Sequence, residues 1–337
     1  MNDRYRILGG LGSPYSMKMR AIMRYRHLPH VWCQINEANM HEMANVRAPV
    51  IPVIQFPDGI YHNDSTPMIF ELERRHPGRR SILPDDERQL FLAFLLEDMA
   101  DEWGTKMMFH YRWFRPVDQK QMSEWLSFDR FVGRGEDQIR SYAAEFAARQ
   151  ISRMALVGCT AKNKPLIEET CDEVLALFER HVMEEPYLFG SRPSLADFGW
   201  LGQLSQLAVD PTPAALLRAR APFTFRWLSQ LDDASGIEGA WRDPDAPLSG
   251  AVRGMLKLAG EVYLPFLLAN RDALEKGAQT FTLKARGHEY EQGTFRYQLR
   301  CLEALRSRFA ALSPAARESL LPVFEEFGLA GPLSAAI

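Results

Sequence analysis

The fold of this chain of 337 residues is decided around one stretch near its start, Leu8-Gly-Gly-Leu-Gly-Ser-Pro-Tyr-Ser-Met-Lys-Met-Arg20. A strand-like run from Tyr5 breaks here into glycines, and an amphipathic segment then continues to His27. Ser13 can cap this expected helix, and Pro14 at the first helical position gives up no N–H group that the helix needs. Strand, glycine turn and helix N-terminus together present backbone N–H groups and a helix dipole to an anion, such as a thiolate. The same pattern is also typical of a capped turn that binds nothing.

The composition is that of an ordinary globular protein, with 46% hydrophobic and 25% charged residues. A net charge of -3 gives no general attraction to nucleic acids or to anionic membranes, so no partner of either kind is expected. The charged N-terminus is not a secretory signal, and no apolar run approaches the ~18 residues of a membrane span. We therefore expect a cytoplasmic protein.

The cysteines are widely spaced and form no Cys-x-x-Cys pair; they are Cys33, Cys159, Cys171 and Cys301. This spacing fits neither a zinc site nor a disulfide framework, and each cysteine is expected to be a small buried side chain. The sequence also lacks a P-loop and a ligand cluster, so a metal or phosphate enzyme is not favoured and no metal is expected.

The first 80 residues mix strands and helices. The expected elements are, in order, a strand over 4–10, a helix over 14–27, a strand over 31–36, a short helix or loop over 39–46, a hairpin over 51–56 and 60–63, and a helix over 64–75. The first two strands are joined through a helix and should be parallel. Because Pro52 cannot donate to a sheet, it fits at the first position of its strand, for instance in a cis peptide bond.

After residue 85 the pattern is helical. Helices are expected over 87–108, over 122–154 as one or two helices, and over 166–182, 194–207 and 223–231. A further block holds expected helices over 252–274, 295–311 and 314–328, with alternating character over 280–284. The expected domains are therefore 1–80, 85–235 and a mostly helical extension, 236–337.

Four short motifs in this order resemble the glutathione transferases over about residues 4 to 232. They are Ser13-Pro14-Tyr15-Ser16, Ile51-Pro52-Val53-Ile54 before the hairpin, Asp64-Ser65 at a helix start, and Ser194-Leu-Ala-Asp197 in the helical part. The resemblance implies an α+β protein with an N-terminal thioredoxin-like domain that binds glutathione, followed by an all-helical glutathione-transferase C-terminal domain. It also implies a cytosolic, serine-type, detoxifying transferase that forms a homodimer. The extension is not covered by the resemblance.

For catalysis, the resemblance implies that Ser13 donates its hydroxyl to the sulfur of glutathione and stabilises the thiolate, which is the nucleophile. Ser16 is the alternative, because some branches of the family use a serine further into the turn. A serine in this place argues against the cysteine-type branches, which form mixed disulfides with glutathione.

For glutathione binding, the resemblance implies four residues. Ile51 would pair through its backbone with the cysteinyl part, and Pro52 matches the family's cis proline. Asp64 would bind the γ-glutamyl ammonium and Ser65 its carboxylate. The family more usually has Glu-Ser here, so Asp64 is a departure, and the pair also fits plain helix capping.

The second substrate would be an apolar electrophile bound between the domains. An aromatic and methionine-rich run could line its pocket or could be helix core; it comprises Trp103, Met107, Met108, Phe109, His110, Tyr111, Trp113 and Phe114. Within it, His110 is expected to be a hydrogen-bonded polar residue and not a base. Glu97, Asp98 and Asp101 lie on the helix from which the family often sends an acid toward glutathione across a dimer interface.

The function favoured by these residues is thiolate attack on an apolar electrophile. The alternative is a non-catalytic binding or scaffold protein of the same fold. For the extension, a lid, a change in the dimer and simple packing all stay open, and His288-Glu-Tyr-Glu291 is expected to be a solvated polar cluster on a turn.

Overall fold

The computed structural model describes residues 3–78 and 80–335. Its contacts divide the chain into two compact units. Unit 1 comprises Met1–Ile82, Tyr111–Ser152 and Phe198–Glu238, and unit 2 comprises Leu83–His110, Arg153–Asp197 and Gly239–Ile337. The middle of the chain, expected as one helical domain, contributes to both units. The division into three consecutive domains stays a prediction, because these units are defined by contacts in space and not by order along the chain.

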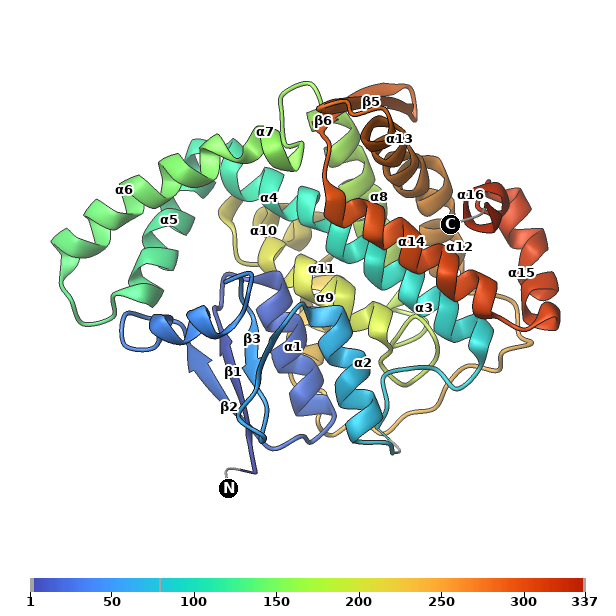
Figure 1. Cartoon of the computed structure of the whole chain (residues 1–337), viewed down its shortest axis with the longest axis horizontal. Coiled ribbons are helices and arrows are strands. Elements are labelled where there is room, and N and C mark those ends of the chain that lie inside the picture. Colours follow the sequence, from blue (N-terminus) through green and yellow to red (C-terminus); the bar gives the residue numbers. More distant parts are fainter. Residues whose placement is uncertain (1–2, 79, 336–337) are drawn as a thin grey trace. The chain divides into compact units, whose positions relative to one another are not determined.

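Unit 1 begins with a four-stranded sheet of order β2-β1-β3-β4. Its strands are β1 (Tyr5–Gly9), β2 (His30–Gln34), β3 (Val53–Gln55) and β4 (Tyr61–Asn63). The sequence predicted two pairings correctly, since β1 is parallel to β2, and β3 and β4 form an antiparallel hairpin. It did not predict the antiparallel pairing of β1 with β3. Helices α1 (Pro14–Tyr25) and α2 (Ser65–Arg75) lie side by side next to this sheet (Figure 1). This is the thioredoxin-like arrangement expected from the sequence.

A short 3-10 helix, η1 (Met40–Asn45), is held on the sheet by one carboxylate. Two nitrogens of Arg6 donate to Glu42 at 2.7 and 2.9 Å, and the Tyr61 hydroxyl donates to Glu42 at 2.7 Å. The bond from Arg6 lowers the pKa of Glu42 to about 2. The segment between β2 and β3 is therefore attached to the sheet.

The helices that lie wholly in unit 1 follow the breakers in the sequence. They are α5 (Pro116–Arg130), α6 (Glu136–Ser152), α10 (Pro211–Arg220) and α11 (Pro222–Leu231). The segment 122–154 forms parts of two helices because Gly133 and Gly135 adopt φ of 81° and 89°, which stops a helix. α5 and α6 form a helical hairpin (Figure 1). The sequence analysis missed α10, whose Thr212 donates from its N–H and hydroxyl to the buried Asp118 of α5.

Unit 2 is helical apart from one β-hairpin. Its elements are α3 (Glu87–Met99), α7 (Met154–Val157), α8 (Lys164–His181), α12 (Gly250–Leu258), α13 (Leu264–Glu275), β5 (Thr280–Ala285), β6 (His288–Gly293), α14 (Arg296–Ala311), α15 (Pro314–Glu326) and α16 (Ala330–Ser334). Two expected long helices each contain a π-helical turn. The first, Ala100–Gly104, joins α3 to α4 (Thr105–Phe114), and the second, Ala259–Tyr263, joins α12 to α13. α4 and α9 (Leu195–Leu207) supply residues to both units.

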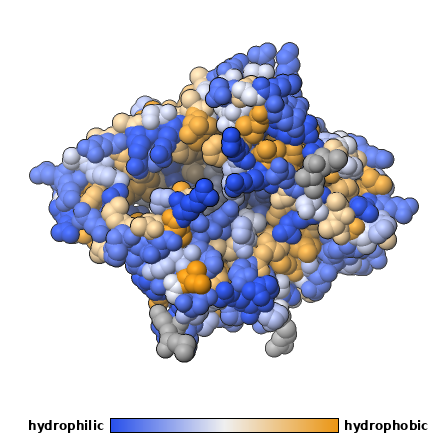
Figure 2. Space-filling model, viewed as in Figure 1, coloured by the Kyte–Doolittle hydropathy of each residue, from blue (hydrophilic) through white to orange (hydrophobic). Residues whose placement is uncertain are grey.

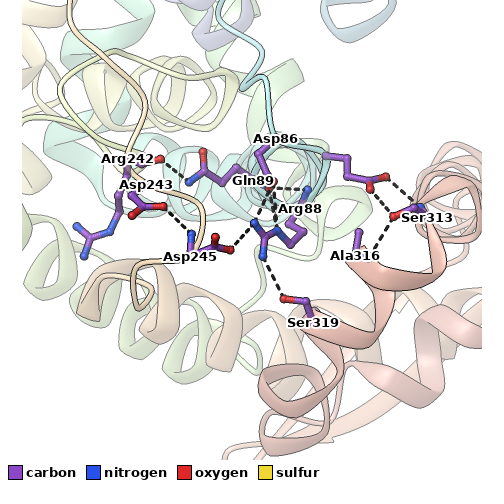
Figure 3. Close-up of polar contacts among 10 residues, drawn as sticks. Asp86, Arg88, Gln89, Arg242, Asp243, Asp245, Ser313, Ala316 and Ser319 are labelled. Atoms are coloured by element: carbon purple, nitrogen blue, oxygen red, sulfur yellow. Dashed lines mark hydrogen bonds and ion pairs between the residues drawn. The ribbon is translucent and has the colours of Figure 1, made fainter.

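The extension packs on α3 (Figure 1). Arg88, in the first turn of α3, donates to Asp245 at 3.0 Å and to the Ser319 hydroxyl at 3.3 Å (Figure 3). The backbone N–H of Ser313, at the start of α15, donates to Glu87 at 2.9 Å. The extension therefore belongs to the packing of unit 2.

The hairpin β5–β6 corrects one expectation from the sequence. His288–Glu291 lies in the strand β6 and not in a turn. Glu289 and Glu291 are exposed, as expected, but Tyr290 is fully buried against the rings of Trp103 and Phe266. Nearby, the buried Lys106 donates to Gln292 at 2.6 Å and to the Val157 carbonyl at 3.0 Å. Burial lowers the pKa of Lys106 to about 8.

Candidate functional site

The glycine turn after β1 presents Ser13. The turn closes through a hydrogen bond from the Ser13 N–H to the Gly10 carbonyl at 3.0 Å, and α1 begins at Pro14 as the sequence predicts. The Ser13 hydroxyl oxygen caps the helix by accepting from the Ser16 N–H at 3.3 Å. Its own O–H donates to no other residue in the described part of the chain. Since Ser13 is partly exposed, this hydroxyl is available to a ligand.

Ser16 lies in a different environment from Ser13. It is fully buried, and its hydroxyl has no hydrogen-bond partner among the residues that the structure describes. A Cβ added at Gly9 would lie 3.0 Å from the Cβ of Ser16 and 2.7 Å from the ring of Trp32. Ser16 therefore belongs to the packing between α1 and the sheet, and a ligand at the surface has no access to its oxygen.

The loop before β3 lies beside the glycine turn. The Ile51–Pro52 peptide bond is cis, as the sequence suggested. Leu8 pairs with Val53, so the antiparallel register brings Ile51 next to Gly10, and a Cβ on Gly10 would lie 3.1 Å from the Ile51 side chain. In the described part of the chain, the backbone of Ile51 makes no hydrogen bond. It can therefore pair with an extended peptide.

The start of α2 lies at the same end of the sheet as the glycine turn and the loop before β3; these three segments are called the row below. Val53 pairs with Asn63, which places Asp64 and Ser65 one strand further from the turn. With strands spaced by about 4.8 Å, Gly10 and Ser65 are separated by roughly 10 Å. Asp64 has φ of 73°, a conformation that costs energy for a residue with a side chain and that is common at ligand sites. The Ser65 hydroxyl, at the first position of α2, has no partner among the described residues.

A buried network of hydrogen bonds, which the sequence analysis missed, holds the glycine turn in place. Arg112 donates to the Gly12 carbonyl at 2.7 Å, and Gln206 donates to the Leu11 carbonyl at 3.1 Å. Arg112 also forms a two-pronged ion pair with Asp210 at 2.8 and 3.0 Å and donates to Gln206 at 2.8 Å. Burial raises the pKa of Asp210, and Arg112 opposes this shift. The network holds the carbonyls that precede Ser13.

A cavity of about 960 Å³ within unit 1 adjoins the same turn. Its wall is mostly apolar and includes Leu11, Gly12, Met17, Met122, Trp125, Leu126, Phe128, Ile139 and Val209. Hydrophobic side chains are visible among hydrophilic ones at the left of Figure 2, where Figure 1 draws α5 and α6. The volume is within the range of small-molecule sites, which run to about 1,000 Å³.

The aromatic run over 103–114 does not line this cavity. Trp103, Met107 and Trp113 are at most 2% exposed, so the core interpretation of this run holds. His110 is fully buried and bonded to Glu168 at 3.0 Å, as expected for a hydrogen-bonded polar residue. Residues of α5, a helix expected from residue 122 but not assigned to a pocket, supply much of the wall in its place.

The acids expected to reach a glutathione across a dimer are also placed differently. Glu97, Asp98 and Asp101 are all buried in unit 2. Asp98 accepts a hydrogen bond from the Tyr263 hydroxyl at 2.6 Å, and burial raises its pKa well above the ordinary value. Their burial does not favour the expected contact with a second subunit, which stays a prediction.

Among the residues that the structure describes, no three His, Cys, Asp or Glu side chains are grouped to hold a metal ion. No helix in this part of the chain is long and apolar enough to cross a membrane. Three of the cysteines are buried and Cys33 is partly exposed; burial raises the pKa of Cys159 to about 12. The arrangement that remains is a row of polar groups at the end of a sheet, beside an apolar cavity.

Two segments of the chain match known family models. Residues 9–80 match the N-terminal domain of the glutathione S-transferases, and residues 143–229 match the C-terminal domain of these proteins. No curated protein matches the chain.

Similar solved structures have low sequence identity to this chain. A glutathione S-transferase from Methylobacterium radiotolerans, in complex with glutathione sulfonate, is 19% identical over 73% of this chain and 100% of its own, with a TM-score of 0.42. A glutathione S-transferase from Rhodospirillum rubrum is 16% identical over 75% of this chain and 91% of its own, with a TM-score of 0.43. The beta-etherase LigF from Sphingobium is 12% identical over 75% of this chain and 98% of its own, with a TM-score of 0.46.

The matched segments follow one another in the order of the family's two domains. The first contains the glycine turn, the cis-proline loop and the start of α2, and the second contains most of α6 and all of α8 to α10. The extension lies outside both. Residues 9–80 and 143–229 of the chain are therefore identified as the N- and C-terminal domains of the glutathione S-transferase family.

Proposed function

We propose that this protein is a serine-type glutathione transferase that joins glutathione to an apolar electrophile. One observation carries the proposal: a single glycine turn both presents the Ser13 hydroxyl and forms part of the wall of the 960 Å³ cavity. A nucleophile held at Ser13 and an electrophile in the cavity would be neighbours.

The residues present fit glutathione as co-substrate. No described residue bonds to the Ile51 backbone, which suits the cysteinyl part of an extended tripeptide. Ser65, whose hydroxyl is unpaired within residues 3–78 and 80–335, offers that hydroxyl and helix N–H groups to a carboxylate. Asp64 offers a negative charge to an ammonium. When bound, glutathione supplies the thiol that acts as nucleophile.

Ser13 and α1 would favour the ionised form of that thiol. A hydrogen bond donated to a thiolate lowers its pKa, and so does the positive end of a helix dipole. The exposure of Ser13 and the complete burial of Ser16 favour Ser13 in this role. Of the two serines that the sequence leaves open as the catalytic residue, Ser13 is therefore preferred.

The first experiment is a calorimetric titration with reduced glutathione, on the full chain and on Asp64→Ala. We expect binding in the micromolar to millimolar range and its loss in the variant, because the ammonium loses its partner. Absence of binding to the unmodified protein would leave the fold standing and favour the scaffold alternative.

The catalytic assignment is tested with Ser13→Ala against Ser16→Ala. We expect Ser13→Ala to raise the pKa of the bound thiol, which is measured by the ultraviolet absorption of the thiolate. The variant should also lower kcat toward 1-chloro-2,4-dinitrobenzene by roughly a hundredfold. Glutathione affinity should change little. If Ser16→Ala produces these effects and Ser13→Ala does not, the roles of the two serines are reversed.

The homodimer and the cytoplasmic location stay predictions from the sequence. The burial of Glu97, Asp98 and Asp101 within unit 2 does not favour a dimer contact through them.

A further inference from the structure

The cavity of unit 1 carries more negative than positive charge. Four charged side chains line it: Glu124, Asp129, Glu136 and Arg140. Arg140 pairs with Glu136 at 2.6 Å and approaches Glu124 at 3.6 Å. The one positively charged side chain among these four, Arg140, is therefore paired with the two glutamates and does not pair with Asp129.

Asp129 has no partner in the part of the chain that the structure describes. No residue there donates a hydrogen bond to it or forms an ion pair with it. The adjacent Arg130 is directed elsewhere, to the Tyr142 hydroxyl and to the sulfur of Met40. Asp129 is half-buried, and burial alone raises the pKa of its carboxyl. A partly desolvated carboxylate without a partner is unfavourable, and a ligand with a complementary group would relieve that cost.

The neighbours of Asp129 suit a cation with an apolar body. Trp125 precedes it by one helical turn on α5 and therefore lies on the same face of the helix. Trp125 and Phe128 both line the cavity and are 51% and 53% exposed, which leaves much of each ring available to a ligand. A carboxylate binds an ammonium by a charge-assisted hydrogen bond, and aromatic faces attract the same cation.

We propose that the cavity takes apolar ligands that carry a positively charged nitrogen, and that Asp129 is the residue that selects them. The inference deepens the proposed function, on which it rests for treating the ligand as the second substrate. Apolar groups of the wall bind the body of the ligand, and Asp129 together with Trp125 binds its charge.

The test uses three probes with one naphthalene ring: 2-(1-naphthyl)ethylamine, 2-(1-naphthyl)ethanol and 1-naphthylacetate. At pH 7 they carry a positive charge, no charge and a negative charge. Calorimetry measures their Kd for the full chain, for Asp129→Asn and for Asp137→Asn. Asp137 is an exposed aspartate of α6 that does not line the cavity, so its variant controls for the net charge of the protein.

For the unmodified protein we expect the amine to bind about tenfold more tightly than the alcohol, and the carboxylate to bind most weakly. Asp129→Asn should bring amine and alcohol to within about twofold, since a neutral amide gives no charge-assisted bond. Asp137→Asn should keep the preference. Thermal unfolding of each variant shows whether it is folded.

Equal binding of amine and alcohol by the unmodified protein would overturn the inference, and so would tighter binding of the alcohol or no binding at all. A preference that survives in Asp129→Asn, or that disappears equally in Asp137→Asn, would also overturn it. The probes are titrated without glutathione, and glutathione is titrated separately. Failure of glutathione to bind then counts against the proposed function alone, whereas failure of the amine preference counts against the role of Asp129 alone.

Discussion

At the scale of single residues, Arg112 is the side chain on which the glycine turn depends most. Replacement by methionine leaves Asp210 buried without a counter-charge and frees the carbonyl of Gly12. It also removes the bond to Gln206, the side chain that donates to the Leu11 carbonyl. We expect Arg112→Met to lower the free energy of unfolding by about 3–5 kcal/mol, measured in urea. It should also lower kcat, because Ser13 loses its support.

A double variant separates these two effects. In Arg112→Met/Asp210→Asn the uncompensated charge is gone, so most of the lost stability should return. The turn stays unsupported, and kcat should stay reduced by roughly tenfold or more. Recovery of kcat together with stability would show that Arg112 has only a structural role.

The polar residues at the end of the sheet could be predicted from the sequence. The buried residues that hold the glycine turn could not. Ser13, Ile51-Pro52 and Asp64-Ser65 are local signals: a helix cap, a proline at a strand start and a second helix start. The pair Arg112 and Asp210 lies 98 positions apart, and neither residue has a local pattern around it. Asp129 resembles any solvated acid on an amphipathic helix until the cavity beside it is known.

At the scale of elements, the hairpin β5–β6 is tied to unit 2 through a buried lysine. Burial lowers the pKa of Lys106 from 10.5 to about 8, so between these values the unfolded chain binds more protons than the folded one. In that window stability must rise with pH. We expect the free energy of unfolding of the unmodified protein, relative to Lys106→Met, to rise by roughly 2–3 kcal/mol between pH 8 and 10.5.

The measurement is urea unfolding of both proteins at several pH values. Lys162→Met is the matched control, because Lys162 is exposed and pairs with Glu291 of the same hairpin. Burial does not depress the pKa of Lys162. The difference in free energy of unfolding between the unmodified protein and Lys162→Met should therefore stay constant or fall as the pH rises. If the difference in free energy of unfolding between the unmodified protein and Lys106→Met does not change with pH, water reaches this lysine.

The hairpin also shows what an element-level analysis can overlook. The alternation over 280–284 is typical of a strand, whereas the mostly polar composition of the second strand is typical of a solvated turn. The signal was present: Arg286 and Gly287, with φ of 52° and 81°, form the tight connection that antiparallel strands favour. Tyr290 and Gln292 then alternate inward. For α5 and α6, the sequence leaves open whether Gly133 and Gly135 divide the segment 122–154 into two helices.

At the scale of the whole molecule, the extension contributes to the core of unit 2, and one glycine tests this. A Cβ on Gly260 would lie 1.8 Å from the backbone oxygen of Phe327, so alanine there must displace the segment after α15. We expect Gly260→Ala to lower the free energy of unfolding by roughly 1–3 kcal/mol and to speed proteolysis near residue 327.

Gly250→Ala is the control for this substitution. Nothing lies within 4 Å of a Cβ at Gly250, which begins α12, so alanine should be neutral or slightly stabilising. Equal effects of the two variants would argue that the end of the extension contributes nothing to unit 2. The sequence could not supply this result, since the contact of Gly260 with Phe327 joins segments that have no common motif.

The packing of α3 has a consequence for how the chain is made. Buried residues occupy every position from Phe91 to Met99. The helices that cover them include α14, which begins at Arg296. About 200 residues separate the two helices, so at ~5–20 residues per second a ribosome needs roughly 10–40 s to deliver the second after the first. During that interval a nascent apolar helix lacks part of its partner surface and must be shielded from aggregation. Deletions near the 3′ end of the coding region should therefore reduce the soluble yield of the whole polypeptide, and not only the stability of its last helices.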